Sequence, residues 1–550
     1  MLVIFKNICY RGSVNDCYSD KINIYKSIEA DSKGKFCENC KNVFPFYTGN
    51  GYIGFSQNSN IMIKNERSLS HDTLINPHYY STIDVNAIIV YSYLFLSYDE
   101  GSIKEFYCYK TPKNTYIWIT RTLFAHCTET NLIYQQFDIE NFSYSTINVK
   151  LDLKNENIFN KISDKYRTAS LYKNDASNSD KLFLSTVKSQ NVNVAAYGKK
   201  TSIILSILHN ESNNNSQVEK ILLNSKNFVE LEINHKFGWQ QLKNSRGFYI
   251  GPSKMNYTVN VEDINRTIYY ILTQSSFNHV QEFDKSLIGQ CYSGHDTLQN
   301  YNLWREPYSM TDLNALLDSW LITLEKQGCQ SLLNDVHGTY QAILYSIGSF
   351  SYRDHHLEMN VDPNIIERNF TFFNISLSKM CSITIQSTIS IYTYMPHMLI
   401  KLNLKKHSIL TDEVSNACEY YACGTGCVNT PVILSKIFTQ IPLYSSKPKS
   451  ALLYVTHNNE HIRELKLAIH VREINLVTPI RDEIMYLHKY GYERRIIPLW
   501  VWMSIVLFVI FCHIAIFHLL LSEFKNSKKL PVYNSKITKD HYLVSKNTTF

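Results

Sequence analysis

The sequence has no basic block. Its 55 lysines and arginines outnumber its 48 aspartates and glutamates and give a net charge of +7, but they are spread along the whole chain. A nucleic-acid-binding face needs clustered lysine and arginine. The even spread therefore excludes nucleic acid as an expected partner.

The chain also lacks a recognisable signal peptide. Residues 1–10, MLVIFKNICY, contain an apolar run of only four residues after Met1, whereas a signal-peptide core needs about 7–15. Two interpretations remain open. The sequence begins after its true signal, or the chain is held by its C-terminal end with its bulk in the cytosol. Residues 1–42 are left as an N-terminal segment of uncertain structure.

No phosphate-binding loop or nucleophile arrangement stands out. The glycines of residues 49–54, GNGYIG, fit neither the dinucleotide nor the Walker spacing. Asn50-Gly51 is instead the strongest short signal for a β-hairpin. No Ser-His-Asp or Cys-His pattern is evident, so we expect a hairpin here, no cofactor and no catalytic residue.

Residues 496–521 form the longest apolar stretch of the chain. They include no formally charged residue, and at about 1.5 Å per residue they can cross a hydrocarbon core of about 30 Å. Trp500 and Trp502 would lie at the interface. The stretch predicts a transmembrane helix followed by a tail, residues 522–550. Positive charges flank it on both sides, so they do not set its direction.

The 13 cysteines indicate the compartment. Cys512 lies in the predicted span, and the other twelve precede it, several as close neighbours. This distribution favours disulfides and an oxidising lumen. The disulfide candidates are Cys37, Cys40, Cys108, Cys127, Cys291, Cys329, Cys423 and Cys427.

Seven asparagines that precede the predicted span head glycosylation sequons. About eight are expected by chance in a chain this rich in Asn, Ser and Thr, so they are compatible with a lumenal location without proving it. The candidates are Asn141, Asn210, Asn214, Asn256, Asn265, Asn369 and Asn374.

The body of the chain is predicted to be globular and mainly β. It has 550 residues, 44% hydrophobic and 19% charged, enough for two or three domains. Short alternating segments at regular intervals predict a large antiparallel β-sandwich over residues 43–290. Cys108 and Cys127 flank adjacent strands there and could bridge them.

A helical segment is predicted over residues 291–347. Apolar residues at helical spacing from Leu313 to Leu324, with Thr311-Asp312 as the cap and Gly328 at the end, predict one helix. A second is predicted to run from Thr339 to Gly348. The period then returns to two over residues 348–485, which predicts a second, smaller β domain with a last strand at 465–474.

The order of several motifs resembles an uncharacterised animal family of single-pass type I membrane glycoproteins, built on a domain of unknown function. The likeness runs from about residue 44 to 524 and implies a lumenal body with a cytosolic tail. Its motifs include Gly49-Asn50-Gly51-Tyr52-Ile53-Gly54, Phe124-Ala125-His126, Cys291-Tyr292-Ser293-Gly294-His295, Leu303-Trp304, His356-Leu357-Glu358 and Tyr421-Ala422-Cys423-Gly424-Thr425-Gly426-Cys427.

A more distant likeness is to sugar-active enzymes of the maltose and kojibiose phosphorylase type. Residues 49–54 match the turn that opens their β-sandwich, and Gly338 with Gln341 matches a pattern on their last barrel helix. That resemblance implies a carboxylic acid on a barrel of twelve helices, which needs upwards of about three hundred residues. Residues 294–346 supply about two helices, so the catalytic barrel is missing.

The carboxylates in that segment have ordinary roles open to them as helix caps and solvated helix faces. We therefore expect no enzyme, with a glycoside hydrolase or phosphorylase-like enzyme as the alternative. The carboxylates concerned are Asp296, Glu306, Asp312, Asp318, Glu325 and Asp335.

Metal binding is weighed against disulfides and a surface pair. Cys37-x-x-Cys40 could be half a zinc site or a redox pair, with Cys418, Cys423 and Cys427 as the other half, but their spacing is loose for zinc. His356 and Glu358 would share one face of a strand without an identifiable third ligand. We expect no metal.

The hypothesis with most support is a non-catalytic lumenal membrane glycoprotein of the secretory pathway, in the endoplasmic reticulum, Golgi or another endomembrane. Its expected partners are the membrane and a protein or glycan.

Overall fold

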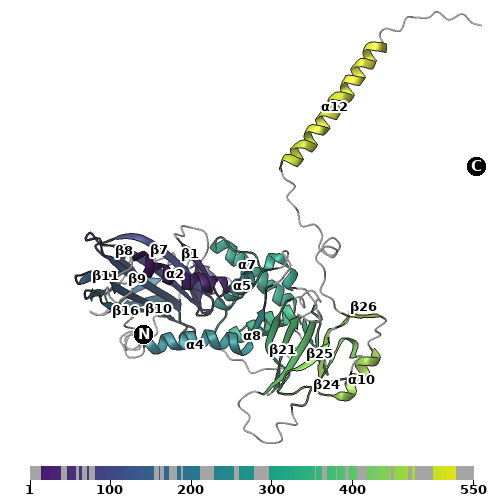
Figure 1. Cartoon of the computed structure of the whole chain (residues 1–550), viewed down its shortest axis with the longest axis horizontal. Helices are drawn as coiled ribbons and strands as arrows, with labels where there is room; N and C mark the ends of the chain where they lie inside the picture. Colours follow the sequence, from purple (N-terminus) through teal and green to yellow (C-terminus); the bar gives the residue numbers. More distant parts are fainter. Residues whose placement is uncertain are drawn as a thin grey trace, which may run out of the picture. The chain divides into compact units, whose positions relative to one another are not determined.

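The computed structural model describes residues 14–38, 46–56, 61–64, 71–73, 81–153, 160–161, 166–171, 182–187, 190–210, 228–252, 259–277, 291, 297–353, 355–361, 368–378, 381–389, 396–404, 418–427, 430–442, 444–447, 451–468, 473–476 and 499–527. The chain divides into two compact units, Met1–Ile480 and Arg481–Phe550 (Figure 1). The first unit is mainly β, and its sheets are antiparallel, as predicted.

A nine-stranded sheet forms one layer of a β-sandwich in the first unit. In spatial order its strands are β1 (Gly34–Glu38), β7 (Ile88–Ser97), β8 (Ser102–Lys110), β9 (Tyr116–Ala125), β10 (Leu132–Asn141), β16 (Lys199–Asn210), β14 (Leu182–Val187), β13 (Tyr166–Leu171) and β12 (Asn160–Lys161).

Two smaller sheets cover this layer. One is β15 (Gln190–Val194), β11 (Ile147–Leu153) and β6 (Ser81–Asp84), and the other is β2 (Tyr47–Gly49), β3 (Ile53–Ser56), β4 (Ile61–Lys64) and β5 (His71–Thr73). Alternation along β11 buries Val149 and Leu151 against Phe137 and Ile139 of β10. Ile53 and Phe55 of β3 pack against Leu123 of β9 in the same way. The period-two pattern thus correctly predicted antiparallel sheets in this part of the chain.

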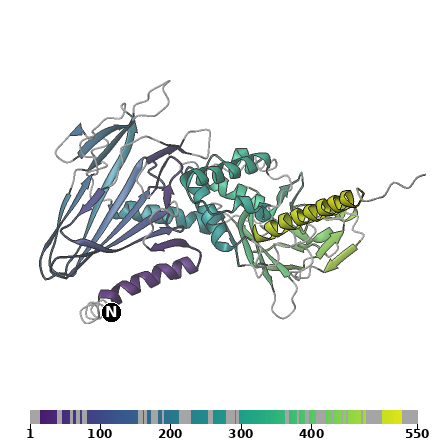
Figure 2. The same ribbon diagram turned by 90° about the horizontal axis from the view of Figure 1, so that it is seen from above.

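The N-terminal segment adds a helix that sequence analysis did not predict. Helix α2 (Val14–Ala30) packs Ile22 and Tyr25 against Phe95 and Phe106 on the nine-stranded sheet, and Figure 2 shows it running along that sheet. The chain then turns into β1, whose residues Gly34 to Glu38 pair with β7.

The two predicted helices are present. Helix α7 (Met310–Lys326) buries Leu313, Leu317 and Trp320, and Gly328 lies beyond its end in the left-handed region, at a φ of 77°. Its cap, however, is Ser309 and not Thr311-Asp312, because the Ser309 hydroxyl accepts from the Asp312 amide at 3.1 Å. Helix α8 (Val336–Gly348) starts three residues before its predicted position.

Two further helices lie inside the stretch predicted as sandwich. They are α4 (Phe228–Arg246) and α5 (Val261–Thr273). One hydrophobic core joins the sandwich, these helices and the C-terminal sheets. It includes Phe46 next to β2, Trp239 of α4, Trp320 of α7 and Val455 of β27.

The C-terminal β region consists of three sheets and a helix. The first sheet has, in spatial order, β17 (Phe248–Ile250), β20 (Phe370–Ser376), β21 (Cys381–Ile389), β22 (Pro396–Leu404) and β25 (Thr439–Pro442). The second has β18 (Phe350–Tyr352), β19 (His356–Met359), β27 (Leu453–Thr456), β23 (Tyr421–Gly424) and β24 (Val432–Ile433). The third pairs β26 (Tyr444–Lys447) with β28 (Glu473–Leu476). The strand predicted at 465–474 is wrong in its first half. Those residues end helix α10 (Asn459–Ala468), whose Ile462 and Leu465 share a buried helical face.

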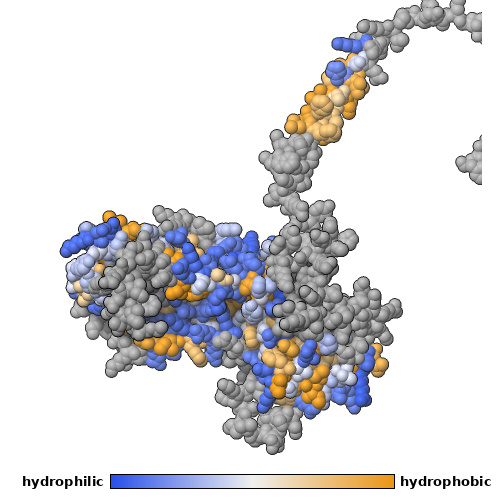
Figure 3. Space-filling view, in the orientation of Figure 1, coloured by the Kyte–Doolittle hydropathy of each residue, from blue (hydrophilic) through white to orange (hydrophobic). Residues whose placement is uncertain are grey.

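The second unit contains helix α12 (Leu499–Ser527), which covers most of the predicted span. Many of its described side chains are apolar and exposed, and they appear as an orange band in Figure 3. Among the residues that the structure describes, no helix combines the length and apolar character needed to cross a membrane. The transmembrane helix at 496–521 therefore finds no support here, and residues 528–550 of the tail lie outside the described residues.

Candidate functional site

The GNGYIG hairpin is a junction between distant segments. Asn50 is fully buried, and its Nδ2 donates to the carbonyl oxygens of His126 at 2.8 Å and Thr130 at 2.9 Å. Its Oδ1 accepts from the amides of Tyr52 at 3.0 Å and Ile53 at 2.8 Å. One side chain thus satisfies four backbone groups from two parts of the sandwich.

Gly51 completes the junction from the other side. Its φ is 81°, and its amide donates to the carbonyl oxygen of Thr273 at the end of α5, at 2.8 Å. A Cβ here would lie 2.2 Å from the backbone carbon of Ser275. The amides that a phosphate loop would offer to a ligand are therefore engaged within the protein, which confirms the hairpin prediction.

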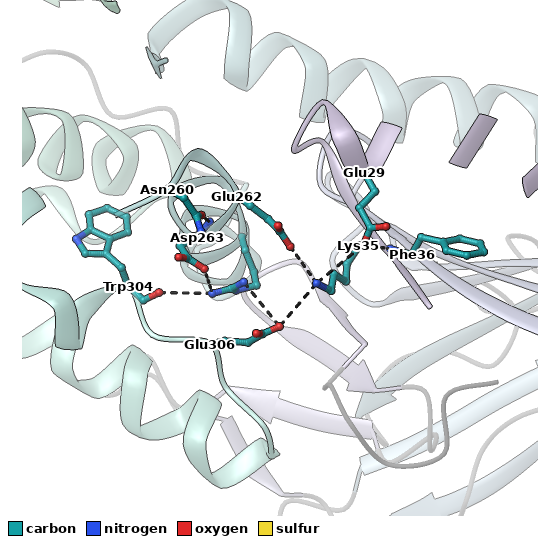
Figure 4. A network of polar contacts seen from close by, with 9 residues as sticks. Glu29, Lys35, Phe36, Asn260, Glu262, Asp263, Trp304 and Glu306 are labelled. Atoms are coloured by element: carbon teal, nitrogen blue, oxygen red, sulfur yellow. Dashed lines mark hydrogen bonds and ion pairs between the residues drawn. The ribbon is translucent and has the colours of Figure 1, made fainter. Parts of the chain in front are cut away.

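A second polar cluster joins three segments of the first unit (Figure 4). We call it the Lys35 network, and its members are Glu29, Lys35, Glu262, Asp263, Arg266 and Glu306. Lys35 Nζ of β1 lies 3.0 Å from Glu262 Oε1 of α5 and 3.9 Å from Glu29 Oε1 and from Glu306 Oε1. Burial alone would lower the Lys35 pKa, but these three carboxylates hold it above its ordinary value.

Arg266 is the buried member of the Lys35 network. It is 1% exposed, forms a close ion pair with Asp263 one turn earlier, and lies with Nη1 3.8 Å from Glu306 Oε1. Its Nη2 also reaches the Trp304 carbonyl oxygen at 3.5 Å. Burial raises the pKa of Asp263, although Arg266 opposes the shift.

Glu306 lies between two cations, which limits its chemistry. Its Oε1 lies 3.9 Å from Lys35 Nζ and 3.8 Å from Arg266 Nη1, so this carboxylate already has ion-pair partners within the protein. Asp335 is buried and accepts from the Gly338 amide as the cap of α8. Asp312 and Asp318 are half-buried and Glu325 is exposed on α7, whereas Asp296 lies outside the described residues. These placements agree with caps and helix faces.

Three disulfides are present among the described residues. Cys291 pairs with Cys329, Cys381 with Cys418, and Cys423 with Cys427. Cys37 is also disulfide-bonded, and Cys40 lies outside the described residues. The zinc alternative for Cys418, Cys423 and Cys427 is thereby wrong. Sequence reasoning did not single out the bridge between Cys381 and Cys418.

The suggested bridge between Cys108 and Cys127 is wrong, since both are free and buried. Cys108 lies opposite Trp118 in the β8–β9 register, and Cys127 follows the far end of β9 at Ala125. At about 3.3 Å per residue, Cys108 and Cys127 therefore lie more than about 20 Å apart along the strand direction. A disulfide needs Cα atoms within about 7 Å.

These two thiols give a testable prediction. Burial raises the pKa of Cys108 to about 11 and that of Cys127 to about 12. Because the thiolate is the reactive form, native protein at pH 8 should leave both unmodified by iodoacetamide, whereas unfolded protein should be labelled at both. Peptide mapping by mass spectrometry measures this, and labelling of either thiol in the native state would contradict their burial.

Four of the predicted sequon asparagines can be placed with their side chains. Asn141 is 2% exposed, and its Nδ2 donates to the carbonyl oxygens of Ser145 and Ala195, both at 2.9 Å. That nitrogen has no room for a glycan, so the Asn141 candidate is wrong for this fold. Asn369 is exposed, and Asn265 and Asn374 are half-buried.

The remaining sequons cannot be placed in this way. Asn214 and Asn256, together with the side chain of Asn210, lie outside the described residues.

The predicted pair His356 and Glu358 has a neighbour that sequence reasoning missed. His461 of α10 places Nε2 3.0 Å from His356 Nδ1, across 105 residues of sequence. Among the described side chains, no three His, Cys, Asp or Glu residues converge as a bound metal ion would require.

A concave surface lies at one end of the sandwich. It has a volume of about 1070 Å³, and its lining includes Asp84, Lys150 and Asn191. Asp84 and Asn191 lie on either side of Lys150 in the sheet register. Ile88 and Val90 line it too and are 77% and 40% exposed. Polar groups and exposed apolar side chains together are typical of a binding surface.

Fold and site define a mainly β, disulfide-bonded protein whose buried polar groups join distant segments. The chain belongs to the family described as "Uncharacterized conserved protein (DUF2152)", whose model matches residues 7–536. This confirms the resemblance to an uncharacterised family, while its membrane and glycoprotein character stay predictions.

Two frog proteins are similar to the chain. The "Uncharacterized protein KIAA2013 homolog" of Xenopus tropicalis is 27% identical over 318 residues, covering 55% of this chain and 49% of that protein. The homolog of Xenopus laevis is 26% identical over 297 residues, covering 51% and 46%. The chain thus matches about half the length of these relatives.

One solved structure has a weak likeness. A "Putative kojibiose phosphorylase from human microbiome" is 11% identical with a TM-score of 0.34, covering 44% of this chain and 41% of that one.

Proposed function

We propose that this chain is a non-catalytic lumenal membrane glycoprotein of the secretory pathway that binds or scaffolds a partner protein or a glycan. The set of three disulfides carries the proposal, because such bonds persist in oxidising compartments and are rare in the cytosol. The location proposed is an endomembrane of the endoplasmic reticulum or Golgi type.

Attachment to that membrane is assigned to residues 496–521. The support is the uncharged sequence, together with the exposure of apolar side chains on α12, where Phe508 is 69% and Phe511 is 72% exposed. A helix that presents large apolar residues all round needs an apolar surrounding.

The non-catalytic part of the proposal is supported by the pairing of carboxylates in the helical segment. Glu306 is held by Lys35 and Arg266, and Asp335 caps α8. The concave surface lined by Asp84, Lys150 and Asn191 is the proposed place for the partner, since it combines hydrogen-bonding side chains with exposed Ile88 and Val90.

The location is tested by glycosylation at Asn369. In the protein made by its native cells, peptide-N-glycosidase should increase the gel mobility, and Asn369→Gln should remove one glycan from the untreated chain because Asn369 is exposed. Asn141→Gln is the matched control and should leave the number of glycans unchanged, since Asn141 is buried. A chain that shows no shift with the enzyme would overturn the lumenal location.

The enzymatic alternative has its own test. Incubation of the full chain with α-glucosides, with and without phosphate, should give no turnover. Turnover that Glu306→Gln abolishes, and that Glu325→Gln on the exposed face of α7 does not, would show that this segment is catalytic and would overturn the non-catalytic proposal.

A further inference from the structure

Two histidines fasten helix α10 to strand β19. His356 Nδ1 lies 3.0 Å from His461 Nε2, with the rings 5.1 Å apart between centroids. Both side chains are largely buried, at 10% exposed for His356 and 14% for His461. This contact belongs to the C-terminal β region and is separate from the Lys35 network.

A carboxylate lies at each outer end of this pair. His461 Nδ1 is 2.9 Å from Glu464 Oε2, and His356 Nε2 is 3.6 Å from Glu358 Oε2. Glu358 also accepts from Arg353 Nε at 3.0 Å. Burial raises the pKa of Glu358, but the hydrogen bonds from His356 and Arg353 outweigh it and hold this pKa below its ordinary value. The carboxylate is therefore ionised at neutral pH.

The row of groups, Glu464–His461–His356–Glu358, requires a fixed number of protons. It contains two hydrogen bonds, of 2.9 Å and 3.0 Å, and one ion-pair contact of 3.6 Å, and each is favourable only with an N–H between its two heavy atoms. Two neutral imidazoles carry two N–H groups, so every neutral arrangement leaves two acceptors facing each other. One extra proton satisfies all three contacts. A second extra proton places N–H against N–H at the central contact.

We propose that His356 and His461 form a proton-sensitive junction, which holds α10 on β19 when the pair carries one extra proton and releases it when a second arrives. Docking of α10 is then tightest at an intermediate pH. It weakens in alkali because the shared proton leaves, and it weakens in acid because two imidazolium ions repel each other across 3.0 Å.

The surrounding charges favour one extra proton over two. Glu358 and Glu464 supply two negative charges, and Arg353 offsets part of the charge of Glu358. His355 lies on the exposed side with its ring 5.3 Å from that of His461, and the Tyr454 ring of β27 is 5.7 Å from that of His356. Glu460 and Arg463 of α10 occupy exposed positions.

Release of α10 has a structural consequence. Ile462 and Leu465 on its inner face pack with Cys423, Cys427 and Tyr454. Loss of the junction therefore uncovers this small apolar cluster together with its disulfide.

The test is hydrogen exchange of the full chain across a pH series, corrected for the intrinsic rate. Protection of α10 amides should fall at least about tenfold between pH 7 and pH 4.5, whereas α7 should keep its protection. His461→Gln should remove this pH step. His457→Gln, at a nearby exposed histidine, should retain it. A step that survives both His461→Gln and His356→Gln, or no step in the wild type, would overturn the junction.

A second measurement uses the wild type alone, so it stays informative if the variants prevent α10 from docking. Exchange at the imidazole C2 position, followed by mass spectrometry of the wild type, reports the protonation of each histidine. His356 and His461 should titrate together in two separated steps, and His457 in one. Independent single steps for the two histidines would overturn the proposal. Binding of one zinc ion per chain that is lost in His461→Gln would also overturn it, because a metal would then take the place of the shared proton.

Discussion

Asn50→Ala is expected to lower the free energy of unfolding of the first unit by about 4 kcal/mol. The substitution leaves four buried backbone groups without their partner, the carbonyl oxygens of His126 and Thr130 and the amides of Tyr52 and Ile53. Each buried group left unsatisfied costs about 1 kcal/mol or more. Urea denaturation of the full chain, followed by tryptophan fluorescence, measures the loss.

Two further variants sharpen this prediction. Asn50→Asp keeps the acceptor for Tyr52 and Ile53 but has no donor for His126 and Thr130, so it should also destabilise strongly. Asn193→Ala is the control, because Asn193 is exposed on β15, and it should change stability by less than about 0.5 kcal/mol. A loss below about 1 kcal/mol for Asn50→Ala would show that the junction does not hold the fold.

Removal of the bridge between Cys291 and Cys329 should have an effect of similar size. The two positions are 38 residues apart, and closing a loop of that length stabilises the folded state by about 4 kcal/mol through the entropy of the unfolded chain. The double variant Cys291→Ala with Cys329→Ala should therefore unfold at lower urea than the wild type under non-reducing conditions.

The bridge between Cys423 and Cys427 provides the matched comparison. It closes a loop of only 4 residues, so its removal should cost about 2 kcal/mol, half as much. All four cysteines are buried, which keeps the loss of packing comparable. Equal losses from the two double variants would contradict an entropic origin.

Local signals in the sequence correctly predicted the elements that depend on neighbouring residues. Asn50-Gly51 predicted the hairpin because its turn needs a positive φ, which Gly51 has. The spacing of Leu313, Leu317 and Trp320 predicted α7 because only one face of that helix is buried.

Elements without a clean pattern were missed for opposite reasons. Helix α5 is buried at every residue from Arg266 to Thr273, so the short apolar run within it reads equally well as a strand. Helix α4 exposes Val229, Ile233 and Phe237, which blurs its period. In both cases tertiary packing decided the structure.

The polar sites depend on contacts that no local pattern encodes. Lys35 and Glu262 are 227 residues apart, and His356 and His461 are 105 residues apart, yet each pair lies at 3.0 Å. Sequence reasoning named Glu306 alone and His356 with Glu358 as a pair, but their partners from distant segments appear only once the strands and helices are assembled. The prediction that Cys108 pairs with Cys127 was wrong because it used only the order of the strands. Residues on neighbouring strands can still lie far apart along the strand direction.

The hydrophobic core that runs from Phe46 to Val455 bears on how this protein can be divided in the laboratory. A fragment ending after the sandwich would expose the hairpin surface that Thr273 and Ser275 cover, and a fragment beginning at the helices would expose Trp239 and Tyr269. Neither half would keep its apolar surface from water. The practical unit for expression, crystallisation and binding studies is therefore the whole stretch from the β-sandwich to α10.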